Sequence, residues 1–267
     1  MKRFIIFIFT ILSFSFALNG QTIAEYREAA EQGNKDAQYN LGVCYYYGDG
    51  VAKDITQAVY WFQKAAEQGD VTSQAFLGKC YYYGEGVTKD YAQAVFWLRK
   101  AAEQGDVTSQ SYMGDCYYFG DGVVKDFTQA VYWFQKAADK GNVTAQSYLG
   151  DCYYYGEGVS KDFVQAVYWF RKAADQGKVI AQSKLGTCYF YGEGVTKDLA
   201  EAVYWFRKAA EQGNANAQYN LGMCYYNGEG VTQDQTQAEY WLNKAAAQSH
   251  TGAQTALRTI LSSSNAH

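Results

Sequence analysis

The sequence predicts an all-α solenoid of six 36-residue helix-turn-helix repeats with terminal half-repeats. Three observations support this fold class. Cysteine and tryptophan recur every 36 residues, apolar residues within each interval have helical spacing, and glycines stand where helices must end. Such a period indicates stacked units rather than one globular core. The periodic residues are Cys44, Cys80, Cys116, Cys152, Cys188 and Cys224, and Trp61, Trp97, Trp133, Trp169, Trp205 and Trp241.

The N-terminal segment has the pattern of a signal peptide. A basic pair at positions 2–3 precedes an uncharged apolar run over residues 4–18, which is shorter than the roughly 20 residues of a membrane-spanning helix. We therefore expect residues 1–20 to be removed, after Ala17 or Gly20, during export to the periplasm or the cell exterior. The mature form is expected to have no membrane attachment. An uncleaved membrane anchor is the alternative interpretation.

The remainder divides into two end units and the repeats. Residues 24–33 match the end of a second helix, so residues 21–33 are expected to form an N-terminal capping half-repeat. Six repeats fill residues 34–249. Residues 250–267 begin as another first helix, but Arg258 replaces the helix glycine and Ile260 replaces the cysteine. We expect a C-terminal capping helix followed by a polar tail, because a solenoid needs atypical units to close its end faces.

The first helix of each repeat is indicated by one apolar face. In the repeat over residues 142–177, Ala145, Leu149 and Cys152 lie on the same side of a helix. Gly150 stands inside this helix, where glycine costs up to about 1 kcal/mol relative to alanine. A close approach by a neighbouring helix is the expected compensation. A Gly-Glu-Gly turn then ends the helix.

The second helix begins at a recognisable cap. Asp162 is the expected N-cap, and Gln165 follows three residues later, as in a capping box. Such a cap contributes about 1 kcal/mol. Trp169 and Phe170 mark the buried face, together with three alanines, and Gly177 ends the helix. Two helices and two short turns use the whole repeat, so no strand is expected.

These residues resemble the Sel-1-like repeat family, a branch of the tetratricopeptide-like helical repeats. The pattern A-x-x-x-L-G-x-C-Y-x-x-G-x-G-V-x-x-D-x-x-x-A-x-x-W-x-x-x-A-A-x-x-G covers residues 24–261. The resemblance implies a right-handed α/α superhelix whose first helices line the concave face. It also implies a scaffold or adaptor that binds a protein or peptide. Some cysteine-rich relatives join the two helices of a repeat by a disulfide, but this chain lacks the second cysteine.

The cysteines are expected to be buried free thiols. Equivalent Cα atoms in stacked helices should lie at least about 8–10 Å apart, whereas a disulfide needs them within about 7 Å. The sequence contains no CxxC pair of the kind that would indicate a zinc site. The acidic residue in each Gly-x-Gly turn is interpreted as a solvated loop charge rather than a calcium ligand. We predict neither a metal nor a cofactor.

Charge and motifs argue against two other function classes. The net charge of −4 does not suit a nucleic-acid backbone. The two histidines, His250 and His267, are not close in sequence to a nucleophile, and G-x-S-x-G and S-x-x-K motifs are absent. We therefore expect a monomeric protein that is not an enzyme and has no catalytic residues. A hydrolase, for which some cysteine-rich relatives give a loose precedent, is kept as an alternative.

An aromatic triplet ends each first helix, for example Tyr153-Tyr154-Tyr155. Three consecutive helical positions span about 200° of the helix surface, so they cannot all face the core. The first is expected in the core and the others partly at the surface. Packing between repeats is the favoured interpretation, and a Tyr-rich rim that binds cell-wall glycan is the alternative.

Three first-helix positions vary between repeats while the core scarcely changes. They lie two residues before, one before and two after the core leucine, off the buried stripe. We predict a partner-binding groove there, with unconstrained surface as the alternative; an exposed row of Phe76, Tyr112 and Tyr148 would favour binding. The candidate residues are Tyr39, Asn40, Phe76, Lys79, Tyr112, Asp115, Tyr148, Asp151, Lys184 and Tyr219.

Overall fold

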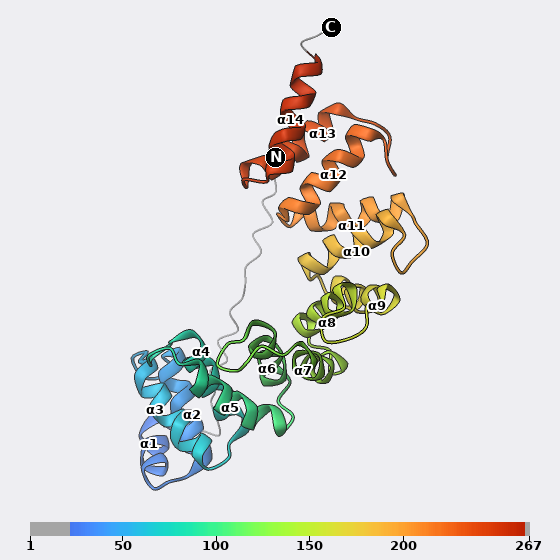
Figure 1. Cartoon of the computed structure of the whole chain (residues 1–267). Helices are drawn as coiled ribbons and strands as arrows, with labels where there is room; N and C mark the ends of the chain where they lie inside the picture. Colours follow the sequence, from blue (N-terminus) through green and yellow to red (C-terminus); the bar gives the residue numbers. More distant parts are fainter. Residues whose placement is uncertain (1–21, 265–267) are drawn as a thin grey trace. The chain divides into compact units, whose positions relative to one another are not determined.

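The computed structural model describes residues 22–264 and contains, within that range, fourteen α-helices and no strand (Figure 1). The predicted signal peptide lies outside the described residues, as does the end of the predicted polar tail. The first helices are α2 (Lys35–Tyr47), α4 (Val71–Tyr83), α6 (Val107–Phe119), α8 (Val143–Tyr155), α10 (Val179–Tyr191) and α12 (Ala215–Asn227). The second helices are α3 (Ile55–Glu67), α5 (Tyr91–Glu103), α7 (Phe127–Asp139), α9 (Phe163–Asp175), α11 (Leu199–Glu211) and α13 (Gln235–Ala247). The terminal helices are α1 (Ile23–Glu31) and α14 (Thr251–Ser264).

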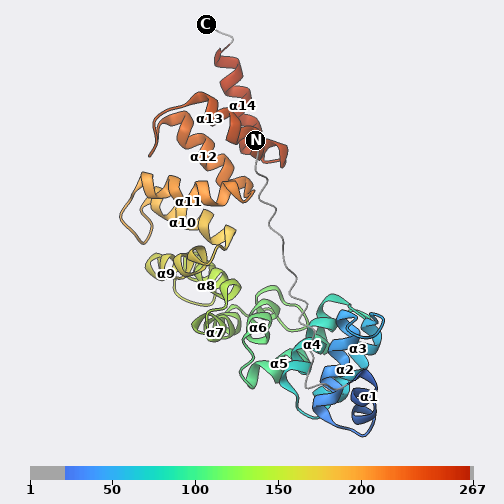
Figure 2. The same ribbon diagram turned by 180° about the vertical axis from the view of Figure 1, so that it is seen from behind.

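The chain forms two compact units that divide within α6, after Ser109. In the first unit each helix from α1 to α5 packs on the next. In the second unit the same is true from α7 to α14, as both views show (Figures 1 and 2). The predicted all-α solenoid is therefore confirmed. In the part of the chain that is described, no helix is long and apolar enough to cross a membrane.

The core of each repeat is completed by its neighbour. Phe170 and Leu149 are fully buried, as predicted from their spacing. Trp205 of α11 belongs to the same buried cluster as Phe170 of α9 and Leu185 of α10. Trp97 and Trp241 pack in the same way with residues of the preceding second helix, which is how stacking adds apolar burial that one hairpin lacks.

The glycine inside the first helix marks a close helix contact, as expected. A Cβ atom on Gly150 would lie 2.5 Å from the ring carbon Cδ1 of Phe170 on α9. A second glycine, Gly158 in the following turn, has a φ of 74°, and a Cβ there would lie 2.2 Å from the carbonyl oxygen of Phe127 on α7. One glycine therefore sets the spacing within a hairpin, and the other sets the spacing between consecutive hairpins.

The second-helix cap is only half of the predicted capping box. The Asp162 carboxylate accepts hydrogen bonds from the backbone N–H groups of Val164 and Gln165. The N–H of Asp162, however, donates to the carbonyl of Tyr153 at 2.9 Å rather than to the Gln165 side chain. The reciprocal part of the prediction was wrong, because this N–H is used to tie the start of the second helix to the end of the first.

A ladder of buried glutamines joins the repeats and was not predicted. Gln182 of α10 donates from Nε2 to the carbonyl oxygen of Ala174 at 3.1 Å. Its Oε1 accepts a hydrogen bond from Nε2 of Gln212 at 2.8 Å. The same glutamine–glutamine hydrogen bond occurs four more times, between Gln38 and Gln68, Gln74 and Gln104, Gln146 and Gln176, and Gln218 and Gln248.

The second aromatic residue of the triplet links neighbouring repeats. The Tyr154 hydroxyl donates to a carboxylate oxygen of Glu193 in the next repeat at 2.6 Å. The Tyr46–Glu85 and Tyr118–Glu157 pairs make the equivalent hydrogen bond. The interpretation of these three acidic residues as solvated loop charges was therefore wrong. Burial, and then the hydrogen bond to glutamate, raises the pKa of Tyr46 to about 12.

All six cysteines are buried and free, which confirms the prediction from their spacing. Burial raises the pKa of every one of these thiols, and it reaches about 12 for Cys80, Cys116, Cys152, Cys188 and Cys224. No cluster of histidine, cysteine and acidic residues suited to a metal occurs among the described residues.

The tyrosine–glutamate link gives a stability prediction. Phe190 occupies the position of Tyr154 and lacks a hydroxyl, while Glu229 lines the same cavity. Phe190→Tyr should add the missing hydrogen bond and raise the free energy of unfolding by about 1 kcal/mol. Urea denaturation measures this change. The reverse substitution, Tyr154→Phe, should lower stability by a similar amount, and an unchanged midpoint in both variants would contradict the assignment.

Candidate functional site

The ten candidate residues of the first helices are half-buried. The position two residues before the core leucine, expected off the buried stripe, is buried in the four middle repeats, where a small residue (Ala75, Ser111, Ser147 or Ser183) packs against the neighbouring helix, so that part of the prediction was wrong. Phe76 stacks on Phe62 of the preceding second helix, with ring centroids 4.9 Å apart. Tyr148 stacks in the same way on Phe134, at 5.1 Å. Phe76, Tyr112 and Tyr148 are thus not fully exposed, and for Phe76 and Tyr148 part of the ring packs between repeats. Their contact with a partner stays a prediction.

Two candidate residues form an ion pair on this face. Lys184 of α10 pairs with the carboxylate of Asp151 on α8. The Lys184 ammonium also lies 5.2 Å from the centroid of the Tyr155 ring. The pair joins consecutive first helices, and it holds the lysine along the surface.

Asp115 stands where Asp151 does, one repeat earlier, but has no such lysine. The equivalent of Lys184 is Tyr148, and the Asp115 Oδ1 atom is buried without a hydrogen-bond partner among the described residues. Burial raises the pKa of Asp115 to about 7, with Lys178 opposing the shift. This carboxylate therefore carries a desolvation cost at neutral pH that Lys178 only partly offsets.

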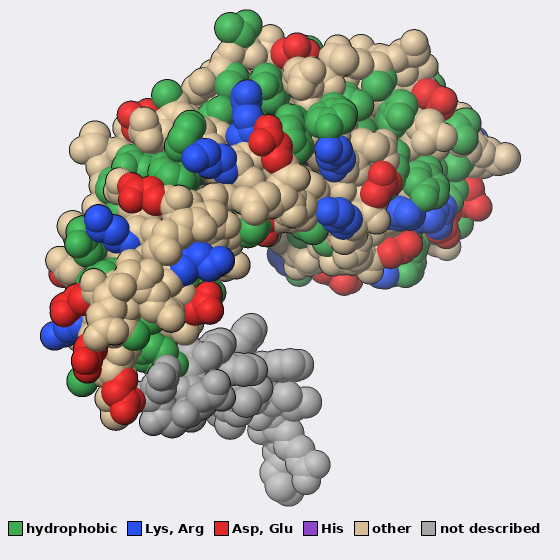
Figure 3. Space-filling view, turned by 90° about the horizontal axis from the view of Figure 1, so that it is seen from below, with side chains coloured by type: hydrophobic (Ala, Val, Ile, Leu, Met, Phe, Trp, Pro, Cys, Tyr) green, Lys and Arg blue, Asp and Glu red, His purple; other side chains and the backbone are tan. Residues whose placement is uncertain are grey.

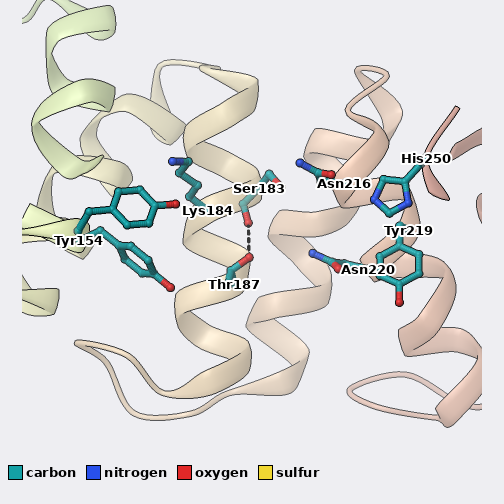
Figure 4. A pocket seen from close by; sticks show the side chains of 9 residues that line it. Tyr154, Ser183, Lys184, Thr187, Asn216, Tyr219, Asn220 and His250 are labelled. Carbon is teal, nitrogen blue, oxygen red and sulfur yellow. Dashed lines mark hydrogen bonds between the residues drawn. The ribbon is translucent and has the colours of Figure 1, made fainter. Parts of the chain in front are cut away.

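One hollow on this face is a cavity of about 390 Å³ in the second unit. Figure 4 shows it between α10 and α12, with tyrosines of α8 on one side and His250 on the other. Two predicted site residues, Lys184 and Tyr219, line it. The full lining is Tyr154, Tyr155, Ser183, Lys184, Thr187, Asn216, Tyr219, Asn220 and His250.

Two further cavities share Tyr219 with the first one. One, of about 240 Å³, lies beside Phe190, Met223 and Asn227. The other, of about 470 Å³, lies between α12 and α14 beside Met223, Ala256 and Ile260. We call the three cavities together the Tyr219 groove. None of these three cavities is lined by the other predicted site residues, which are Tyr39, Asn40, Phe76, Lys79, Tyr112, Asp115, Tyr148 and Asp151.

His250 belongs to this groove and was missed by the sequence reasoning. Its ring stacks on Tyr219 with centroids 4.7 Å apart. Its Nδ1 atom accepts a hydrogen bond from the backbone N–H of Ala253 at 3.1 Å, so His250 caps α14. Its register could have revealed this, because position 250 is 36 residues after the N-cap Asn214.

The aromatic rims do not form an open ladder of second-position rings in the described residues. Tyr154 is half-buried, packs edge-on against Phe163 at 5.1 Å, and has its hydroxyl bonded to Glu193. The third-position rings are exposed, up to 66% for Tyr191. Tyr153, expected in the core, is only partly buried. The geometry thus gives no specific support for the glycan alternative.

One cavity places a thiol near a carboxylate. Cys224 and Glu229 both line the cavity beside Phe190. Burial, and then Glu229, raises the pKa of the Cys224 thiol to about 12, whereas a nucleophilic cysteine needs a lowered pKa. This arrangement therefore does not favour hydrolase chemistry.

Comparison with known families identifies the repeat. A model of the Sel1 repeat matches six consecutive segments, residues 35–70, 71–106, 107–142, 143–178, 179–214 and 215–250. The chain belongs to the Sel1 repeat family. Sel1 repeat proteins generally act as protein-interaction modules and are typically non-catalytic helical scaffolds.

Two solved Sel1 structures are similar over most of the chain. The protective antigen c5321 of uropathogenic Escherichia coli strains, which displays an SLR fold, is 40% identical with a TM-score of 0.80; the match covers 87% of this chain and 50% of that chain. A Sel1 repeat protein from Oxalobacter formigenes is 36% identical with a TM-score of 0.72, and the match covers 89% and 69%. The chain thus spans half the length of the E. coli protein. No protein with a curated description matches it.

Because the Asp115 Oδ1 atom is buried without a hydrogen-bond partner in the described part of the chain, we predict that replacing Asp115 stabilises the protein by an amount that depends on pH. A raised pKa in the folded state means that wild-type stability falls as the pH rises from about 4 to about 7, because only the folded state resists deprotonation of Asp115. Asp115→Asn removes that loss and should be more stable than wild type at pH 8 by on the order of 2 kcal/mol. Urea denaturation at pH 4 and pH 8 should show the advantage growing with pH.

Asp175→Asn is the matched control, since it removes the same charge from an exposed position at the end of α9. It should change stability little at either pH. An Asp115→Asn variant with the same effect at both pH values would contradict the assigned cause.

Proposed function

We propose that the chain is a non-enzymatic scaffold that binds a protein or peptide partner along its first helices, at the Tyr219 groove. The observation that carries the proposal is that three adjoining cavities share one variable residue, Tyr219. Lys184, Thr187, Asn220 and Met223, which also line them, occupy positions that differ between repeats. The general role of Sel1 repeats in protein interaction supports the same function.

The character of the groove suits a polypeptide. Asn216 and Asn220 offer amides that can both donate to and accept from a peptide backbone. Tyr219 offers a large ring that loses little conformational entropy on binding. Helices on both sides fix these groups before a partner arrives, so the ordering cost of association is small. On the face shown in Figure 3, acidic, basic and hydrophobic side chains are interspersed.

The groove is tested by variants matched for residue type. A partner should first be captured by cross-linking with the full chain and identified by mass spectrometry. Its dissociation constant, measured by calorimetry, should rise at least about ten-fold in a Tyr219→Ala/Asn220→Ala variant, since a central tyrosine commonly contributes more than about 1 kcal/mol.

Tyr204→Ala is the control, because Tyr204 is an exposed tyrosine on the second helix α11. It should leave affinity unchanged. Equal affinity of wild type and the folded double variant, or equal losses in all variants, would place the binding surface elsewhere.

The proposed scaffold acts as a monomer in the periplasm or outside the cell. The signal-peptide pattern of residues 1–20 supports export. Intact-mass measurement of the secreted or periplasmic protein should find an N-terminus at Leu18 or Gln21, and light scattering should give the mass of one chain. A protein that retains residues 1–20 in the membrane fraction would overturn the proposal in favour of an anchor.

A further inference from the structure

An aromatic ring fills the gap between consecutive hairpins at two places in the chain. In each case the ring belongs to the residue one before the core leucine, and it lies flat on the buried phenylalanine of the preceding second helix. Phe76 stacks on Phe62, with ring centroids 4.9 Å apart and an interplanar angle of 14°. Tyr148 stacks on Phe134 at 5.1 Å and 9°. The chain itself thus shows what this gap accepts.

Rings of the triplet that ends the preceding first helix form the sides of the gap. The Tyr118 ring centroid lies 5.5 Å from that of Tyr148, and the Phe119 centroid lies 6.0 Å from it. In the first unit, the Tyr46 centroid lies 5.7 Å from that of Phe76. We call this arrangement the aromatic box. It has a floor from the second helix, sides from the triplet, and a ring stacked on the floor.

The aromatic box recurs at Phe206, but with an asparagine in place of the stacked ring. Asn220 has the place in its repeat that Phe76 and Tyr148 have in theirs. A cavity of about 240 Å³ lies there, and its lining includes Phe206, Asn220 and the triplet rings of Phe190 and Tyr191. The floor and both sides of the box are therefore present around this cavity.

The walls at Phe206 have the geometry of a filled box. The centroids of Phe190 and Phe206 are 6.3 Å apart, and those of the equivalent Tyr118 and Phe134 are 6.2 Å apart. Tyr191 is exposed, so the cavity opens at the surface. A cavity of about 150 Å³ can hold a benzene ring, so this one is large enough for an aromatic side chain.

We propose that the aromatic box at Phe206 takes a phenylalanine or tyrosine side chain of the partner, whose ring stacks on Phe206 as Phe76 stacks on Phe62. The inference rests on the proposed function and specifies the partner as a peptide segment that presents an aromatic residue. Stacked and edge-on ring pairs are favourable beyond the area that they bury, and the box offers both. Tyr219 lines the same cavity, so this anchor lies inside the Tyr219 groove.

A lysine of the partner fits this box less well than an aromatic residue. One repeat earlier Lys184 takes the place of the ring, and its ammonium lies 5.7 Å from the centroid of the equivalent phenylalanine ring and pairs with Asp151. At the Phe206 box, uncharged Thr187 stands where Asp151 does. Glu229, the carboxylate in the lining, accepts a hydrogen bond from Asn227.

A glycan also fits less well than an aromatic side chain. Its hydroxyl groups would lose their hydration against Phe190, Phe206 and Met223. An aromatic ring gains free energy by being buried among the same residues.

The substitution Asn220→Phe tests the inference by filling the box from within the chain. The new ring has the place of Phe76 in its repeat, so it should stack on Phe206, raise the urea midpoint and exclude a ring of the partner. Asn243→Phe, which adds the same ring at an exposed position of α13, is the matched control. Asn220→Leu is a second, smaller filling, to be used if Asn220→Phe does not fold.

The probe is a phage-displayed library of random peptides, selected on the full chain. We expect the enriched peptides to share a phenylalanine or tyrosine. In a synthetic peptide from that pool, replacing this residue by alanine or by lysine should weaken binding at least about ten-fold, a loss common for a central aromatic anchor. Asn220→Phe should weaken binding of the unaltered peptide to a similar extent, and Asn243→Phe should leave it unchanged.

The outcomes separate the two levels of the proposal. Peptides that bind Asn220→Phe as tightly as wild type, but do not bind folded Tyr219→Ala/Asn220→Ala, would overturn the aromatic-box inference and leave the groove intact. Peptides that bind both variants as tightly as wild type would overturn both. A pool enriched in lysine rather than in aromatic residues, or a pool with no enrichment, would overturn the inference.

Discussion

The close contact between a glycine of the first helix and a fully buried side chain of the second is the constraint on which the repeat depends. With Phe170 against the backbone at Gly150, the two helices approach closely enough to exclude water from Leu149 and Cys152. The helix-propensity cost of glycine is offset by this packing. The same contact determines which residues of the first helix turn away from the core, and in the Tyr219 groove these include Asn220 and Met223.

Polar contacts add specificity to this apolar stack. The buried glutamine of one repeat, such as Gln182, satisfies a helix-end carbonyl of the preceding second helix and accepts from a glutamine of the following one. Buried polar groups are costly unless they are paired, so this arrangement favours one register between repeats over slipped alternatives. The Tyr154–Glu193 bond acts similarly at the turn. Within each unit, register therefore depends on directional bonds as well as on shape.

Most of the fold could be predicted from the sequence because its causes are local and repeated. Spacing alone indicates that Gly150 marks a close helix contact, that Asp162 caps a helix and that Trp169 lies on a buried face. The six copies of the repeat make this pattern clear. The partner of the Asp162 N–H could not be predicted, because it depends on how the turn brings Tyr153 back to the second helix. The hydroxyl contact of Tyr154 likewise depends on the neighbouring repeat.

The candidate site was predicted less completely. Comparison between repeats found Lys184 and Tyr219 because variation outside the core is visible in a repetitive sequence. His250 and the α14 residues were missed, since the last segment departs from the repeat pattern where it closes the groove. Phe76 and Tyr148 pack against rings of the preceding second helix, and Asp151 pairs with Lys184, which spacing alone does not distinguish from an open surface.

The short reach of the bonds between repeats has a mechanical consequence. The glutamine and tyrosine bonds join residues only 30 and 39 positions apart, so each hairpin is held by its immediate neighbours. Low sequence separation favours rapid assembly, because little loop entropy is lost before a contact forms. Under tension along the chain, hairpins within a unit should detach one after another rather than in a single rupture. Such a molecule can lengthen in steps while the rest of the unit stays folded.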